Sequence, residues 1–307
     1  MLGGLRFVSL IEQDTRLTVR IGGEPLAAAL EPATASGYVS LVAGPLFLEV
    51  YDADLLAEDA SDDDARIGAL TLRLEPGAFG SVVFSAADEG VGVLELYSQP
   101  AGAEGVLTQE PDREWTGTAP WALQVPPARY RLRVARQDHD SYELEVEITG
   151  GEAEVIDVEL SEGDGQESSH RQRTRTLLFR TEVVTDDVVM PSAGDARLRV
   201  VNMHAPTEGL AVHVNPAPAR RRVRELELTP IVDAEPLFAE LAAFEASPYR
   251  ALPAGLYDVR VQTADGPGVL AAKPDLNLTS GAVYSLFLFG TDEPRIMVVV
   301  DALVDTR

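Results

Sequence analysis

Two stretches of the chain are closely alike: residues 24–53, EPLAAALEPATASGYVSLVAGPLFLEVYDA, and residues 235–264, EPLFAELAAFEASPYRALPAGLYDVRVQTA. They align without gaps, and 13 of the 30 positions are identical. Shorter matches lie on both sides, pairing residues 5–8 with 198–201, 17–21 with 210–214, and 74–78 with 278–282. Matching blocks in the same order indicate an internal duplication.

The repeated blocks have the pattern of β-strands. Leu17, Val19 and Ile21 alternate with Thr18 and Arg20, which is the period of a strand with one buried face. An Ala-Gly pair follows at 43–44 and again at 254–255, where glycine permits a tight turn. Several short strands separated by turns predict an all-β fold, with each copy an antiparallel β-sandwich of the immunoglobulin-like (Ig-like) type.

One segment departs from this pattern. Leu237, Leu241 and Phe244 lie at helical spacing and follow Pro236, a residue favoured in the first turn of a helix. The spacing predicts one short helix in the C-terminal domain, over residues 236–247.

The region between the copies has a strand pattern of its own. Tyr130, Leu132 and Val134 alternate with arginines, and the following apolar residues from Tyr142 to Ile148 alternate with glutamates. We therefore predict a sandwich repeat over residues 1–96, a small β-domain over 97–160, a flexible polar linker over 161–176 and a second repeat over 177–307. Residues 93–96 fit either neighbour, and a further strand region at 177–190 has no equivalent in the first copy.

Two family resemblances follow from these segments. RFVSL at 6–10 with YVSLVAG at 38–44, and RVVNMHAP at 199–206 with YRALPAGLYDVRV at 249–261, resemble the Ig-like family called domain of unknown function 4397. SQPAGA at 98–103, GTAP at 117–120 and VPPARY at 125–130 resemble a PEGA domain. The resemblances imply Ig-like sandwiches around a PEGA-like module. They also imply a secreted, surface or envelope location, with no established catalytic activity.

Composition excludes several kinds of partner and chemistry. The formal net charge is −25, from 50 acidic and 25 basic residues, so most of the surface repels nucleic acid and anionic membranes. There is no cysteine, which excludes disulfides, thiolate metal sites and cysteine nucleophiles. No uncharged run is long enough to span a bilayer. The N-terminus lacks a signal-peptide pattern, so we expect an extracellular or envelope protein if an upstream signal was removed, and a cytoplasmic one otherwise.

The acidic segment after residue 51 is a candidate metal site. Calcium takes six to eight oxygen ligands from clustered carboxylates and carbonyls, and this segment is rich in carboxylates. It lacks the glycine and terminal glutamate of an EF-hand at the required spacing, and a solvated, mobile acidic loop is the favoured interpretation. The candidate calcium ligands are Asp52, Asp54, Asp59, Asp62, Asp63 and Asp64. No other cofactor is predicted.

Two further features could contact a partner. The 18-residue insertion in the second copy carries the only dense basic cluster, which could dock a protein or another copy of the chain, or neutralise nearby acids. This partner-binding candidate comprises Arg220, Arg221, Arg222 and Arg224. Trp115 and Trp121 could stack on a sugar or a protein, or could close a small core.

The sequence predicts a protein without catalysis. Its four histidines are far apart, and nucleophile-elbow, phosphate-loop and dinucleotide motifs are missing. We expect a structural or interaction protein of the cell surface or envelope, acting in adhesion, scaffolding or assembly. A calcium- or glycan-binding surface module is the alternative. An enzyme whose centre forms only in the fold is the third possibility.

Overall fold

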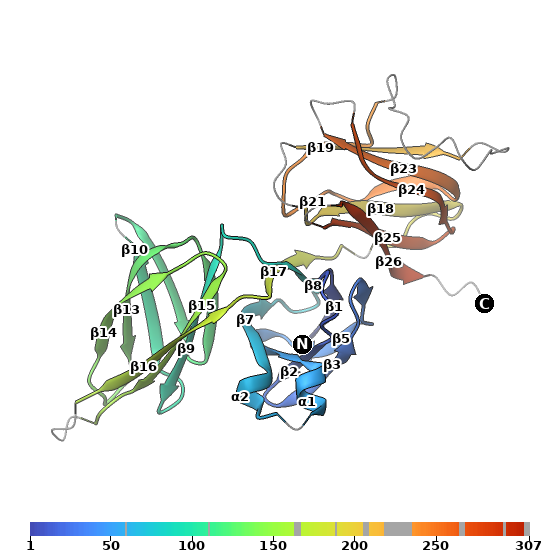
Figure 1. The fold of residues 1–307 in the computed structure, drawn as a ribbon. Coiled ribbons are helices and arrows are strands. Elements are labelled where there is room, and N and C mark those ends of the chain that lie inside the picture. The colour runs from blue at the N-terminus through green and yellow to red at the C-terminus, as the bar shows by residue number, and fades with distance from the viewer. Residues whose placement is uncertain are drawn as a thin grey trace. The chain divides into compact units, whose positions relative to one another are not determined.

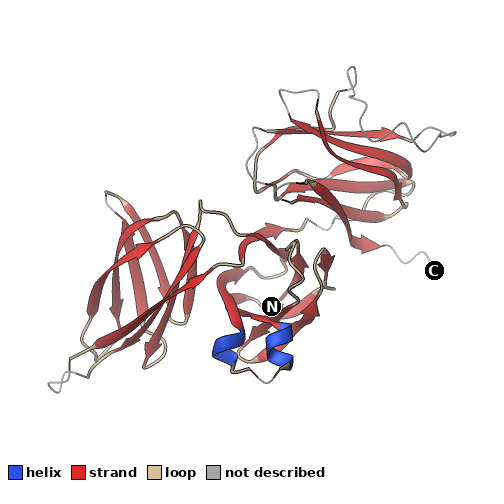
Figure 2. Cartoon of the chain, viewed as in Figure 1, coloured by secondary structure: helices blue, strands red, loops and turns tan. Residues whose placement is uncertain are grey.

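The chain is described by a computed structural model (Figure 1). The structure describes all residues except 59, 110, 163–166, 188, 205–208, 218–234, 264–267, 291–292 and 304–307. The described residues form 26 strands and two short helices, so the fold is all-β, as the sequence predicts (Figure 2). Within the described residues, neither helix has the length and apolar character that crossing a membrane requires.

The chain divides into two compact units. Unit 1 comprises Met1–Pro32, Ser36–Ala78 and Ala86–Thr181. Unit 2 comprises Ala33–Ala35, Phe79–Ser85 and Glu182–Arg307. We use "first module" for residues 1–86, "middle domain" for residues 92–176 and "second module" for residues 195–303.

In the first module, one sheet has the strand order β3-β2-β6-β7, and β1 pairs antiparallel with β5. Leu17, Val19, Leu48 and Val50 on the sheet are buried, because alternate side chains along each strand point to the same face. The strands are β1 (Leu2–Ser9), β2 (Leu17–Ile21), β3 (Glu24–Leu30), β4 (Thr34–Ala35), β5 (Val39–Val42), β6 (Gly44–Asp52), β7 (Arg66–Leu74) and β8 (Phe79–Ala86).

The middle domain is a sandwich of two four-stranded sheets, β11-β10-β13-β14 and β12-β9-β15-β16. β9 pairs antiparallel with β12 and parallel with β15. The strands are β9 (Gly92–Gln99), β10 (Glu104–Gln109), β11 (Arg113–Thr118), β12 (Trp121–Val125), β13 (Ala128–Ala135), β14 (Tyr142–Ile148), β15 (Glu152–Glu159) and β16 (Ser169–Thr176).

A pair of glycines makes room for Trp121 in this core. Gly105 and Gly117 face each other across β10 and β11. A Cβ atom on Gly105 would lie 2.5 Å from the Leu96 side chain, and one on Gly117 would lie 2.4 Å from the indole of Trp121. Trp121 is 4% exposed, so the interpretation that it closes a core is confirmed. The half-buried Trp115 packs edge-on against Tyr130 at 5.8 Å.

The second module is also a sandwich. One sheet has the order β21-β18-β25-β26 with β22 pairing β18, and the other has the order β20-β19-β23-β24. Their inner faces share one apolar core that includes Leu198, Val212, Val259 and Leu286. The strands from the boundary onward are β17 (Phe179–Thr185), β18 (Asp195–Asn202), β19 (Leu210–Pro216), β20 (Phe238–Leu241), β21 (Glu245–Ala246), β22 (Arg250–Pro253), β23 (Gly255–Thr263), β24 (Val269–Leu278), β25 (Ala282–Phe289) and β26 (Arg295–Leu303).

The strand registers confirm the duplication that the sequence predicts. In the first module Leu2 lies opposite Val42, and in the second Asp195 lies opposite Pro253, which are the aligned positions. Backbone conformation repeats as well. Each module has two non-glycine residues with positive φ at matching positions, Ala29 and Ala33 in the first and Glu240 and Phe244 in the second.

The predicted helix over residues 236–247 is wrong. The segment forms β20 and β21, and the two helices lie in the first module as α1 (Ala53–Ala57) and α2 (Asp62–Ala65). A β-bulge explains the misleading spacing. Phe238 pairs with Val212 and Leu241 with Leu210, so three steps on β20 match two steps on β19. Glu240, at φ 54°, takes up the extra residue, and the buried residues acquire a helix-like spacing.

Two predicted boundaries of the middle domain are also wrong. Residues 93–96 belong to β9, a central strand of the middle domain, so a boundary after residue 96 would cut a strand. The predicted linker over 161–176 contains β16, which pairs with β15 along its whole length. Polar side chains on β16 made it look like a linker because an exposed edge strand has few apolar contacts. The predicted strand region 177–190 contains β17.

Candidate functional site

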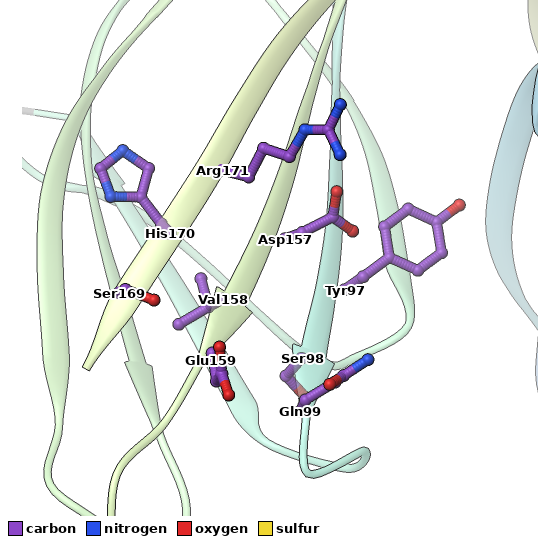
Figure 3. Close-up of a pocket in the computed structure, with 9 residues that line it drawn as sticks. All are labelled: Tyr97, Ser98, Gln99, Asp157, Val158, Glu159, Ser169, His170 and Arg171. Carbon is purple, nitrogen blue, oxygen red and sulfur yellow. The ribbon is translucent and has the colours of Figure 1, made fainter. Parts of the chain in front are cut away.

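A polar groove of about 510 Å³ lies on the outer face of β9, β15 and β16, and we call it the junction groove (Figure 3). The strand register places Asp157 between Tyr97 on β9 and Arg171 on β16, so these three side chains form one row. The lining residues are Tyr97, Ser98, Gln99, Asp157, Val158, Glu159, Ser169, His170 and Arg171. A carboxylate beside a guanidinium and an aromatic ring can bind a polar, hydroxyl-bearing ligand.

Tyr97 is the anchor of the groove. The guanidinium of Arg66 stacks over its ring at 4.8 Å, and Phe47 meets it edge-on at 5.9 Å. Its hydroxyl donates a 3.5 Å hydrogen bond to Glu95. Burial, and then the negative charge of Glu95, raise the pKa of this hydroxyl far above its ordinary value, although Arg66 lowers it. Tyr97 therefore remains a neutral hydrogen-bond donor rather than a base or nucleophile.

Beneath Tyr97, buried charges join the first module to the middle domain, and we call this set of contacts the charged joint. Glu95 on β9 is 0% exposed and accepts a 2.5 Å hydrogen bond from Nη2 of Arg175 on β16. Nη1 of Arg175 donates to the backbone oxygen of Arg66 on β7 at 2.9 Å. Arg66 in turn donates to Glu49 on β6 at 3.2 Å. A buried carboxylate is stable only when such partners satisfy it.

Close packing supports the charged joint on both sides. The backbone N–H of Ala122 on β12 donates to the hydroxyl of Thr71 on β7 at 2.9 Å. Gly68 on β7 packs against the ring of Phe179, so closely that a Cβ atom there would lie 2.5 Å from the ring. A side chain at this position would therefore force the Phe179 ring to move. The Ala122–Thr71 hydrogen bond and the charged joint thus connect the middle domain directly to the first module.

A second hollow of about 490 Å³ adjoins the junction groove and shares Tyr97 and Ser98 with it. Its lining is mostly apolar and comes from both the first module and the middle domain. The remaining lining residues are Ile21, Gly22, Pro45, Leu46, Phe47, Glu49, Ala101 and Pro120. The two hollows together present a polar surface and an apolar surface on either side of one tyrosine.

The candidate calcium ligands are distributed over helix caps and ion pairs. Asp52 is the N-cap of α1, and its side chain accepts from the backbone N–H groups of Asp54 and Leu55. Asp54 forms an ion pair with Arg16. An N-cap carboxylate satisfies amide groups that the helix leaves unpaired, and this accounts for Asp52 without a metal. Asp59 lies outside the described residues.

The remaining acids of this loop face different arginines. Asp62 pairs with Arg20 at 3.2 Å, and Asp63 lies 3.6 Å from Arg66. Asp64 accepts from the hydroxyl of the N-cap residue of α2. Among the described residues, no group of three or more carboxylates or histidines is arranged to hold a metal. The described candidate calcium ligands therefore do not form one cluster, and the four arginines 220–222 and 224 lie outside the described residues.

The histidines occupy separate places. His170 hydrogen-bonds through Nδ1 to the hydroxyl of Tyr142 at 2.7 Å, and its ring points away from Tyr97 and Asp157 (Figure 3). Ser169 is its neighbour on β16, so the two side chains point to opposite faces of the sheet and cannot form a nucleophile–base pair. The other histidines, also apart from one another, are His139, His204 and His213.

Comparison of the sequence with protein-family models and with curated proteins gives no match. The functional assignment therefore depends on the residues themselves. Sequence reasoning missed Tyr97, Glu95 and Arg175. A signal for Glu95 was present, because a single acid inside the apolar strand Val93–Tyr97 is typical of a buried, paired charge. Its partners could not be identified, since Arg175 lies 80 residues further along the chain.

Proposed function

We propose that the chain is a non-enzymatic structural or interaction protein of the cell surface or envelope, acting in adhesion, scaffolding or assembly. The observation that carries this proposal is the charged joint formed by Glu95, Arg175, Arg66 and Glu49. The resemblance of the modules to the Ig-like family named above and to PEGA domains supports the same class of function.

The charged joint suits a scaffold for a physical reason. Domains connected by a flexible linker reorient freely, and their interfaces are usually small and polar. Arg175, which binds the buried Glu95 in its own sheet, also donates to the backbone oxygen of Arg66 on β7, and the Arg66 guanidinium stacks on Tyr97. Separating the two parts of unit 1 would break both contacts, and these contacts favour one arrangement. A protein that positions other molecules needs this fixed arrangement, whereas a binding loop does not.

The location can be tested in the cells that produce the protein. We expect fractionation to recover the full-length protein in the envelope or medium, and protease added to intact cells to degrade it. Recovery in the cytosol, protected from the protease, would overturn the proposed location. A cytosolic marker protein that stays intact in the same cells is the control for lysis.

The charged joint can be tested by limited proteolysis. Glu95→Ala removes the partner of Arg175, and we expect it to expose the connection at residues 87–91 to cleavage and to lower stability by about 3–5 kcal/mol. Glu114→Ala, on the exposed strand β11, is the matched control and should leave the cleavage rate unchanged. Equal cleavage rates for the wild type and Glu95→Ala would contradict a rigid joint.

The junction groove favours a second candidate, a glycan-binding surface module. Sugars present hydroxyls to carboxylates and amides and apolar ring faces to aromatic side chains. Asp157, Glu159 and Gln99 supply the polar groups, and Tyr97 with the adjoining apolar hollow supplies the other surface.

Titration with a panel of neutral and acidic oligosaccharides tests this candidate. We expect Asp157→Ala and Gln99→Ala to weaken binding at least tenfold, which corresponds to a loss of about 1.4 kcal/mol. Arg129→Ala, exposed on β13, is the control and should bind as the wild type does. Absence of binding to any sugar of the panel, or equal binding by all variants, would exclude the glycan role.

A further inference from the structure

The middle domain presents two edge strands side by side. β14 ends the sheet β11-β10-β13-β14, and β16 ends the sheet β12-β9-β15-β16 (Figure 1). The hydroxyl of Tyr142 on β14 and Nδ1 of His170 on β16 lie 2.7 Å apart, so both edges belong to the same flank of the sandwich. An edge strand exposes unpaired backbone N–H and C=O groups that can pair with another strand.

The two edges carry opposite charges at the same spacing. Glu143, Glu145 and Glu147 alternate along β14 and are exposed on the outer face of their sheet. β16 carries arginines on its own outer face at 171, 173 and 175. In each row, three like charges stand at every second residue. The two rows therefore match each other in sign and in spacing.

Three charges of these rows have no side-chain partner among the described residues. Arg171, Arg173 and Glu145 form no hydrogen bond or ion pair with another side chain in the described part of the chain. Glu145 lies opposite Arg131 on β13 without an ion pair between them. Glu143 and Glu147, by contrast, form long ion pairs with Arg133 and Arg129 on β13, at 3.8 and 3.7 Å.

Strand direction decides how two copies could meet. The short connection at residues 149–151 reverses the chain between β14 and β15, and β16 runs antiparallel to β15, so β14 and β16 run in the same direction. A two-fold axis parallel to the strands keeps that direction and exchanges the two layers. It brings β14 of each copy beside β16 of the other, with both charged rows on the same face.

Charge selects this arrangement over the other edge-to-edge pairing. Joining β14 to β14 would place glutamates opposite glutamates, and joining β16 to β16 would place arginines opposite arginines. Like charges directly opposite each other across strands are destabilising, whereas opposite charges stabilise. In the mixed arrangement Glu143 faces Arg171 and Glu145 faces Arg173, while Arg175 remains bound to Glu95.

We propose that the flank formed by β14 and β16 is a self-association surface, on which two copies of the chain pair edge to edge through β14 of one and β16 of the other. The contact occurs twice in the dimer, so both sheets of each middle domain continue into the partner. The surface shares β16 with the charged joint, through Arg175, and with the junction groove, through Arg171. A monomer in solution would leave the proposed structural role and location untouched.

Sedimentation velocity of the full chain tests the proposal in about 0.1 M salt, where repulsion between acidic copies is screened beyond about 10 Å. We expect a wild-type dimer. The variants R171E/R173E and E143R/E145R each place like charges together at both contacts, and each should weaken the dimer by about a hundredfold. Arg113→Glu, on the opposite edge strand β11, is the control and should dimerise as the wild type does.

Mixing the two variants separates this pairing from any other cause. R171E/R173E has two acidic edges and E143R/E145R has two basic edges, so an equimolar mixture should form a heterodimer although each variant alone is monomeric. Circular dichroism identical to that of the wild type shows that each variant folds. A wild-type monomer at every concentration, a dimer unaffected by the reversals, or a mixture that stays monomeric would each overturn the proposal.

Discussion

The two modules are alike on the inner side of a strand and unlike on its outer side. Val50 on β6 and Val261 on β23 occupy matching positions, and both are buried in the cores of their modules. One residue earlier, Glu49 matches Arg260. Glu49 accepts from Arg66, whose guanidinium stacks on Tyr97 of the middle domain, so the outward position of the first module supports the charged joint.

This difference shows where the duplicated module could change. An inward side chain must fit a closely packed core, where even one methylene matters, so both copies keep apolar residues there. An outward side chain is free of that constraint. Phe47, which packs against Tyr97, is replaced by Asp258 at the matching position of the second module. The contact with the middle domain thus lies on the outer side of β6, away from the buried core.

Both modules also keep a buried arginine beside a tyrosine. The guanidinium of Arg6 lies 5.1 Å from the ring centre of Tyr38, and that of Arg199 lies 4.7 Å from the ring of Tyr249. Arg199 donates to the hydroxyl of Ser285 at 2.7 Å and forms an ion pair with Asp186. The pair is therefore a structural element of the module rather than a feature of one copy.

The largest expected effect comes from breaking this element. Arg199→Met leaves Asp186 buried without its cation, and we expect the unfolding transition of unit 2 to lose about 3–5 kcal/mol. Replacing Asp186 by Asn in the same chain should recover part of the loss, because the unpaired charge is then absent. Urea unfolding followed by fluorescence and circular dichroism measures both.

The matching substitution in the first module, Arg6→Met, can be compared with Arg199→Met in the second. Arg6 is 1% exposed and stacks on Tyr38, so Arg6→Met should also destabilise the protein strongly. The exposed Arg73→Met should change stability by less than about 0.5 kcal/mol. A large loss for Arg199→Met with no loss for Arg6→Met would show that only the second copy depends on its buried arginine.

A smaller loss of stability, equal in the two modules, is expected at a matching serine in each module. The hydroxyl of Ser36 accepts from the backbone N–H of Phe7 at 2.9 Å, and that of Ser247 accepts from Val200 at 2.9 Å. Ser36→Ala and Ser247→Ala each leave a buried amide unsatisfied, at a cost of about 1–3 kcal/mol. Thermal unfolding should give similar losses for the two variants, and a loss in one alone would break the equivalence.

The strands could be predicted because burial imposes a period of two on the sequence. Leu17, Val19 and Ile21 have that period, and the structure places them on β2. The segment at 236–247 has a misleading helical spacing because the bulge at Glu240 changes the spacing of the buried residues from two to three. The same bulge is present near Ala29 in the first copy, where alanines gave no misleading apolar pattern.

The charged joint could not be predicted in full. Glu95 is a visible exception in an apolar strand, but its ion-pair partner Arg175 comes from β16, which in turn contacts the backbone of β7. Such pairs depend on which strands of different sheets come together, and a single sequence contains no local pattern for that. The acidic residues after residue 51 were visible, yet their neighbours in the fold are arginines such as Arg16 and Arg20 from earlier in the chain.

A third prediction concerns alkaline pH. Burial, and then the negative charge of Asp301, raise the pKa of Tyr249 above its ordinary value of about 10. Above that pH the unfolded chain loses this proton while the folded chain keeps it, so stability should fall as the pH rises further. Tyr249→Phe should make the fall less steep, at a cost of about 1 kcal/mol at neutral pH for the lost hydrogen bond to Asp301. Urea unfolding at pH values from neutral upward measures both, and an unchanged slope would contradict the assignment.

The smallest effect is a gain in stability at the shared positive-φ positions. Ala29 has φ 48° and Glu240 has φ 54°, a backbone conformation that costs a non-glycine residue about 1–2 kcal/mol. Glycine removes this strain but increases the entropy of the unfolded chain, so Ala29→Gly and Glu240→Gly should each stabilise by roughly 0.5 kcal/mol. Differential scanning calorimetry resolves such shifts, and Ala122→Gly, at a buried strand position, should instead destabilise. A gain in both copies would show that the bulge is an inherited feature of the module, kept despite its strain, whereas a loss in either would mean that the side chain there has acquired a contact of its own.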